Sequence, residues 1–294
     1  MSFPLSPPLA LLALVAAFAM NGPAPAMATE PAAARIAIEY VPPKNPALQE
    51  VYTLLRQRQA LEKVQAAFSP FRLPMDVTIR TFECGVSNAW YQPINHRPTV
   101  TLCYEYLRDI WEALPKETTE AGITPIDALA GQFFFAAAHE FGHLSFDVYD
   151  IAIFGREEEA ADNFATYIML QLREDAHRLI AGAAYSYHHM LVEDRQQDSK
   201  ATLRLAAFSS NHGQPEERFF NLLCIAYGSD DKRFADVVEK KYLPETRAKD
   251  CKYEFEGLQH AFRKEISPHI DKDKAAEVME KDWLAGIVSP PPLR

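Results

Sequence analysis

The stretch "IDALAGQFFFAAAHEFGHLSF", residues 126–146, is apolar on almost every side of an α-helix. Thr124 and Pro125 precede it as a predicted N-cap and first-turn pair, and Asp127 falls in the first turn. A helix this apolar has to be covered all round by other elements. The pattern therefore predicts a buried central helix around which the rest of the chain packs.

Three polar residues interrupt this apolar helix in the motif "HEFGH", residues 139–143. On a helix, H-E-x-x-H places the imidazoles of His139 and His143 one turn apart, where both reach one zinc ion at about 2.0–2.1 Å. Glu140 lies beside such a metal and can take a proton from a water molecule that attacks a carbonyl. Burying these groups without a metal or partners would be costly, so the motif predicts a zinc site.

The acidic run "GREEEAAD", residues 155–162, is expected to supply the third ligand from the start of a second helix. A catalytic zinc site uses three protein ligands, and a ligand helix often also carries a carboxylate that holds a zinc histidine through its other ring nitrogen. One helical turn is four residues, and only Glu158 has an acid, Asp162, at that spacing. We therefore predict Glu158 as ligand and Asp162 as the partner of His139.

The two neighbouring glutamates, Glu157 and Glu159, are expected to point elsewhere on a solvated helix face. Asn163 follows Glu159 at the same spacing and could also orient a histidine, so Glu159 is the alternative third ligand.

The combined motif "HEFGH…EEAAD" resembles the gluzincin metallopeptidases, in which H-E-x-x-H is followed by E-x-x-x-D on a second helix. With "GREEEAADNFA" and "NLLCIAYGSD" it more closely resembles a family of secreted bacterial proteins known only as putative metallopeptidases. This resemblance extends over most of the chain. It implies one Zn²⁺ ion, a zincin-like fold, and hydrolysis of a peptide or protein substrate with Glu140 as general base.

The segment "NAWY", residues 88–91, resembles the Asn-Ala-aromatic strand with which thermolysin-like peptidases pair a substrate backbone. The resemblance implies that Asn88, Ala89 and Trp90 bind an extended peptide, with the Asn88 amide holding a substrate carbonyl. The alternative is an ordinary turn and strand end.

His212, ahead of the predicted helix "PEERFFNLLCIAY", resembles in position the histidine that stabilises the oxyanion in thermolysin-like enzymes. A donor aimed at the developing negative charge is expected on physical grounds. A surface histidine is the alternative, and Tyr149, Tyr185 and Arg218 are rival donors.

The first 28 residues are typical of a signal peptide. An apolar core over residues 9–20 precedes Ala26 and Ala28, which suit cleavage before Thr29, although no Lys or Arg precedes the core. The apolar run is too short to span a bilayer, and no later stretch is a better candidate. We expect a periplasmic or extracellular protein without an integral membrane segment. Its net charge of -10 argues against nucleic acid or an anionic membrane as partner.

Four cysteines suit two disulfides in an oxidising compartment. Cys84 with Cys103 would clip a hairpin-like segment, and Cys224 with Cys251 would tie two helices together. Four free core thiols are the alternative.

The periodicity predicts an α+β fold. Strand patterns at 35–41, 75–84, 89–93 and 99–106, with one helix over 45–68, indicate a small mixed sheet with flanking helices in residues 29–115. Residues 116–287 should form a mostly helical body, with helices near 176–192, 215–227 and 244–265, and the resemblance to gluzincins implies that this body is zincin-like. We expect 29–287 to be a single domain and 288–294 a disordered tail.

Two other functions suit the same motif. In a non-catalytic zinc-binding protein, the fourth metal position would be filled by the protein. A metal-dependent amidase would act on cell-wall peptides rather than on general protein substrates.

Overall fold

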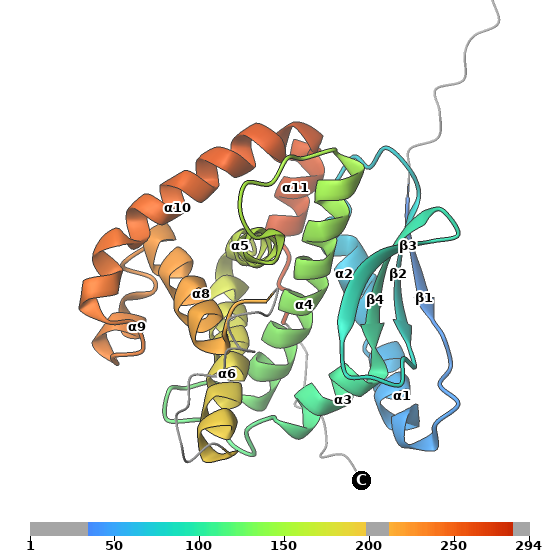
Figure 1. The fold of residues 1–294 in the computed structure, drawn as a ribbon, viewed down its shortest axis with the longest axis horizontal. Helices are drawn as coiled ribbons and strands as arrows, with labels where there is room; N and C mark the ends of the chain where they lie inside the picture. Colours follow the sequence, from blue (N-terminus) through green and yellow to red (C-terminus); the bar gives the residue numbers. More distant parts are fainter. Residues whose placement is uncertain (1–34, 198–211, 285–294) are drawn as a thin grey trace, which may run out of the picture. The chain divides into compact units, whose positions relative to one another are not determined.

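The computed structural model describes residues 35–197 and 212–284, with side chains for 35–190 and 212–284. The predicted signal peptide and C-terminal tail lie outside these ranges. The described strands are β1 (Ile36–Tyr40), β2 (Val77–Phe82), β3 (Ala89–Ile94) and β4 (Arg97–Cys103). The described helices are η1 (Pro46–Leu48), α1 (Gln49–Gln57), α2 (Ala60–Phe68), α3 (Tyr104–Glu112), α4 (Pro125–Val148), α5 (Glu157–Leu170), α6 (Arg173–Gln197), α8 (Pro215–Ser229), α9 (Ala235–Glu239), α10 (Glu245–Glu265), η2 (Ser267–His269) and α11 (Lys272–Met279). A small sheet and a mostly helical body confirm the predicted α+β class (Figure 1).

The sheet is mixed, with strand order β1-β2-β4-β3. Strands β1, β2 and β4 run parallel, and β3 pairs with β4 in the antiparallel direction. Asn95 and His96 form the two-residue turn between β3 and β4, and both have positive φ angles, as a type I′ hairpin requires. The hairpin leaves β3 at one edge of the sheet, where it packs against α4.

The helix predicted over residues 45–68 is interrupted, and that part of the prediction is wrong. After α1 the chain passes through Gln59, which has a left-handed backbone conformation (φ 51°), and α2 starts at Ala60. The start of a helix leaves its first N–H groups without partners inside the helix. Tyr40 of β1 provides one: its hydroxyl accepts from the Leu61 N–H at 2.7 Å and donates to Glu62 at 2.6 Å.

Helix α4 forms as its sequence predicts. Thr124 accepts from the Asp127 N–H at 3.2 Å, Asp127 accepts from the Thr124 N–H at 3.0 Å, and Pro125 occupies the first turn. The helix lies between the sheet on one side and α5 and α6 on the other (Figure 1). His139 and Glu140 are buried within this helix, so the fold holds both groups away from bulk solvent.

Two glycines allow α4 and α6 to approach each other at backbone distance. A Cβ atom on Gly182 of α6 would lie 1.8 Å from the Asp127 carbonyl oxygen, and one on Gly131 of α4 would lie 2.4 Å from that of Leu179. No real Cβ tolerates such contacts, so any larger residue has to separate the helices.

We expect Gly182→Ala to lower the free energy of unfolding by about 1–3 kcal/mol, because the clash is with backbone that cannot rotate away. Urea denaturation followed by circular dichroism measures this. Gly257→Ala in α10 is the matched control, since a Cβ there meets nothing within 4 Å. Alanine is favoured over glycine by about 1 kcal/mol inside a helix, so the control should be neutral or stabilising. Equal destabilisation by both changes would contradict the close approach.

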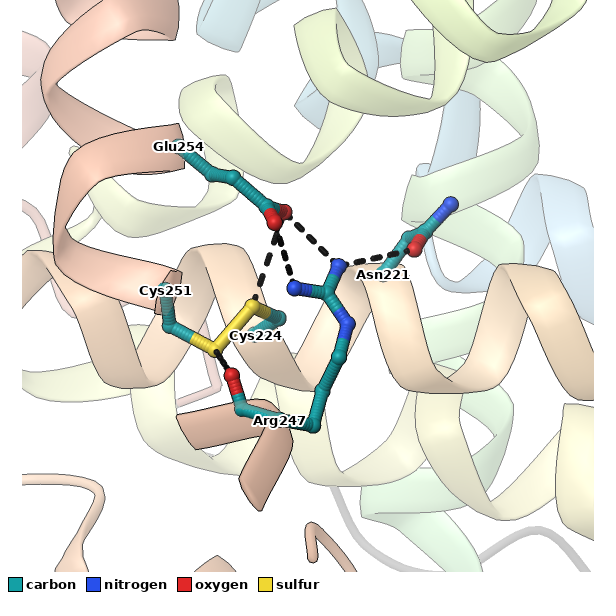
Figure 2. The surroundings of a disulfide bond; sticks show 5 residues. All are labelled: Asn221, Cys224, Arg247, Cys251 and Glu254. Atoms are coloured by element: carbon teal, nitrogen blue, oxygen red, sulfur yellow. Dashed lines mark hydrogen bonds and ion pairs between the residues drawn. A yellow bond between two sulfur atoms is a disulfide. The ribbon is translucent and has the colours of Figure 1, made fainter. Parts of the chain in front are cut away.

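The two predicted cysteine pairs are the pairs at bonding distance, Cys84 with Cys103 and Cys224 with Cys251. The second joins α8 to α10, beside an ion pair in which Arg247 donates to Glu254 at 2.7 Å (Figure 2). Two such pairs are consistent with an exported protein. None of the described helices has the length and apolar content that a membrane crossing requires.

Candidate metal centre

The atoms that could hold a metal come from two helices that pack against each other. Helix α4 presents His139 and His143 one turn apart, and α5 presents Glu158 in its first turn. The two Nε2 atoms lie 3.2 Å apart. The Glu158 Oε2 atom lies 3.0 Å from Nε2 of His139 and 3.5 Å from Nε2 of His143.

This triangle fits the donor set of a zinc ion. Tetrahedral zinc with bonds of about 2.0–2.1 Å to nitrogen and oxygen separates neighbouring ligand atoms by about 3.3 Å. All three separations lie close to that value. His139, His143 and Glu158 could therefore bind one metal ion. A second cluster, of Cys84, Cys103 and Glu105, offers no such site because its sulfur atoms form a disulfide.

Each histidine is held through its other ring nitrogen. The Nδ1 atom of His139 lies 2.8 Å from Asp162, as the spacing within α5 predicts. The Nδ1 atom of His143 lies 2.8 Å from Glu157. Carboxylates at these positions fix the tautomer that leaves Nε2 free to bind a metal.

The contact of Glu157 corrects the expectation that its side chain points away from the site. Within one helix, Glu157 and Glu158 point about 100° apart, which favours a solvated position for the first. However, α5 crosses α4 so that Glu157, the first residue of α5, contacts His143. The more deeply buried Asp162 contacts His139. The Glu157 side chain is still 57% exposed.

Arg218 of α8 completes the support of His139. Its Nε and Nη2 atoms donate to the two Asp162 oxygens at 2.8 and 2.6 Å, and its guanidinium lies 4.8 Å from the centre of the Tyr187 ring. From the sequence, Arg218 is only a rival oxyanion donor. The sequence does carry a signal, because Arg218 is the single basic residue of α8 and a buried acid beside a metal site needs a cationic partner.

The carboxylates of Glu158 and Asp162 make the metal centre strongly favourable for positive charge. Burial would raise the pKa of Glu158, but hydrogen bonds from His139, His143 and His212 hold it well below its usual range. Burial alone would lower the pKa of His139, yet Asp162 and Glu158 raise it to about 9. A group that holds a proton this firmly lies in a field that also attracts a metal cation.

Glu140 lies next to the ligand atoms and is 7% exposed. Burial raises its pKa, whereas the neighbouring His139 and His143 lower it. The backbone N–H of Tyr91 on β3 also lowers this pKa, so the glutamate lies beside the sheet edge. Glu140 and His139 line a cavity of about 130 Å³, together with Asn88, Ala89, Tyr106, Gln132, Phe135, Ala136, Tyr187, Met190, His212 and Arg218.

Comparison with known families agrees with this geometry. A family model described as "Putative metallopeptidase" matches residues 40–265, which include every residue of the metal centre. The chain belongs to this family. No curated protein and no solved structure matches the chain.

In this member of the family, the predicted substrate residues lie at different places. Asn88 and Ala89 line the cavity beside Glu140. Trp90 does not, because successive residues of a strand point to opposite faces of the sheet and Ala89 takes the face of the cavity. The Trp90 indole N–H is buried and has no hydrogen-bond partner among the described residues.

His212 stands at the metal centre, whereas two of its rivals stand elsewhere. Its Nε2 atom lies 2.9 Å from the Glu158 carboxylate, and it lines the cavity. Tyr149 stacks on His269 with ring centres 3.9 Å apart, and Tyr185 donates to the Ala113 carbonyl at 3.4 Å. Neither tyrosine lines the cavity, so among these candidates His212 and Arg218 do.

Proposed function

We propose that this metallopeptidase is an exported, zinc-dependent endopeptidase of gluzincin type. The observation that carries the proposal is the triangle of His139, His143 and Glu158, with Glu140 beside it and the cavity next to it. Among the described residues, no fourth ligand atom belongs to this group. An open position is what distinguishes a catalytic site from a structural zinc site.

The chemistry follows from the positions of the side chains. A zinc ion held there would lower the pKa of water and polarise a peptide carbonyl. Glu140 accepts the proton of the attacking water at its carboxylate and then delivers it to the nitrogen of the leaving amine. Asp162 and Arg218 keep the His139 ring in place during both steps. His212 donates to the carbonyl oxygen as negative charge develops on it.

The edge strand β3 suits an extended peptide. The Cys103 N–H donates to the Asn88 carbonyl at 3.2 Å, so Asn88 uses its backbone groups toward β4. In an antiparallel ladder this alternates, and the backbone groups of Ala89 and Tyr91 point toward the open edge. A substrate strand can pair with them while Asn88 offers its side-chain amide in the cavity.

Removing the metal tests the proposal. We expect the purified protein to contain about one zinc ion per chain and to cleave members of a mixed peptide library. Treatment with 1,10-phenanthroline should abolish cleavage, and added Zn²⁺ should restore it. Bound zinc without cleavage of any peptide would indicate a non-catalytic zinc protein. Cleavage of purified cell wall alone would indicate the amidase.

A further inference from the structure

A second cavity lies against a different face of α4 from the metal-centre cavity. It has a volume of about 130 Å³ and is bounded by α1, α2, α3, α4, the start of α6 and the segment after α11. Phe133 and Phe134 line it, whereas the next two residues of α4, Phe135 and Ala136, line the metal-centre cavity. No described residue lines both cavities.

The walls of this second cavity are apolar except at two points. Among the residues that the structure describes, the only charged ones in the lining are Arg58, in the break between α1 and α2, and Lys63 of α2, and both are partly buried. Neither side chain has a hydrogen bond or ion pair with any residue that the structure describes. Burial and the nearby Arg58 lower the pKa of Lys63, so the two cations lie close enough to repel each other. An anion between them would relieve that repulsion.

Size and chemistry select the occupant. An apolar cavity of about 150 Å³ accepts benzene, so about 130 Å³ suits a chain of roughly six to eight carbons and cannot hold two acyl chains. Apart from Arg58 and Lys63, the described wall residues carry apolar side chains and two indoles, which offer no row of partners to a peptide backbone. We propose that this cavity binds the anion of a medium-chain fatty acid, with its alkyl chain against Phe133 and Phe134 and its carboxylate at Arg58 and Lys63.

Calorimetric titration of the purified protein with octanoate tests the proposal. We expect saturable binding of about one octanoate per chain, because one cation pair serves one carboxylate. The double variant Arg58→Gln, Lys63→Gln should weaken binding roughly tenfold to a hundredfold, as loss of charge-assisted hydrogen bonds predicts. 1-Octanol, with the same chain but no charge, should bind more weakly and be insensitive to the double variant. Acetate, with the charge but no chain, should not bind.

Arg56→Gln is the matched control, since Arg56 is an exposed cation on α1 that bonds Tyr52 and does not line the cavity. Binding unaffected by the double variant, or weakened equally by the control, would overturn the assigned carboxylate position. Absence of octanoate binding would overturn the site itself. If octanoate binds a variant that ends at Leu284 but not the full chain, the proposed fatty-acid site would also be overturned. Residues 285–294 of the chain would then be the occupant. These readouts do not involve peptide hydrolysis, so they are independent of the proposed peptidase function.

Discussion

Replacing Glu140 with Gln is expected to abolish peptide hydrolysis while zinc stays bound. General-base catalysis contributes about 10²–10⁴-fold to a rate, and an amide cannot accept the proton of the attacking water. The metal should remain because the three ligand atoms belong to other residues. The variant should also fold, since a glutamine side chain has the size of the buried glutamate and carries no charge for burial to penalise. Steady-state kinetics with metal analysis of the same sample measures both effects.

Glu256→Gln provides the matched control for the loss of one carboxylate. Glu256 is exposed on α10, far along the chain from the metal centre, and it lines neither cavity discussed above. The activity and zinc content of the Glu256→Gln variant should equal those of the unchanged protein. Full hydrolysis by the Glu140 variant with zinc bound would remove Glu140 from the mechanism. Loss of zinc together with activity would instead assign the residue to metal binding.

Much of the fold follows from local patterns in the chain. The apolar run in residues 126–146 and the Thr124-Pro125 start define α4, because a helix and its N-cap depend on neighbouring residues. The break at Gln59 is not predicted, because it depends on a residue that is distant in the sequence. The helical periodicity continues through it, and the hydroxyl that accepts from the start of α2 comes from Tyr40 on a separate strand.

The same division runs through the metal centre. The spacing rule finds Glu158 and Asp162 because both lie on one helix, four residues apart. It does not find Arg218, which is 56 residues beyond Asp162 and approaches from α8. Nor does it find the contact of Glu157 with His143, which depends on how α5 crosses α4. Contacts between helices depend on packing, which no periodicity within a single helix encodes.

Three adjacent glutamates are expected to give three different results when each is replaced by Gln. Glu158→Gln should weaken zinc binding by more than about a hundredfold, because it removes the charge of a ligand whose oxygen lies 3.0 Å from the His139 Nε2 atom. Glu157→Gln should weaken it by roughly tenfold, since its carboxylate holds the Nδ1 atom of His143 from a partly solvated position. Glu159→Gln should change nothing, because Glu159 is exposed and lines a separate cavity.

Competition with a chromophoric zinc chelator ranks the three affinities, and circular dichroism shows whether each variant is folded. Glu159 serves as the internal control, because it has the same charge, the same helix and the same first turn as the other two. A large loss at Glu159 would shift the ligand register by one residue and remove Asp162 from its role beside His139. Equal affinities for the Glu157 and Glu159 variants would restore the expectation from helical spacing alone. A graded loss in the order Glu158, Glu157, Glu159 is expected from the way α5 crosses α4, because spacing within α5 alone assigns no histidine contact to Glu157.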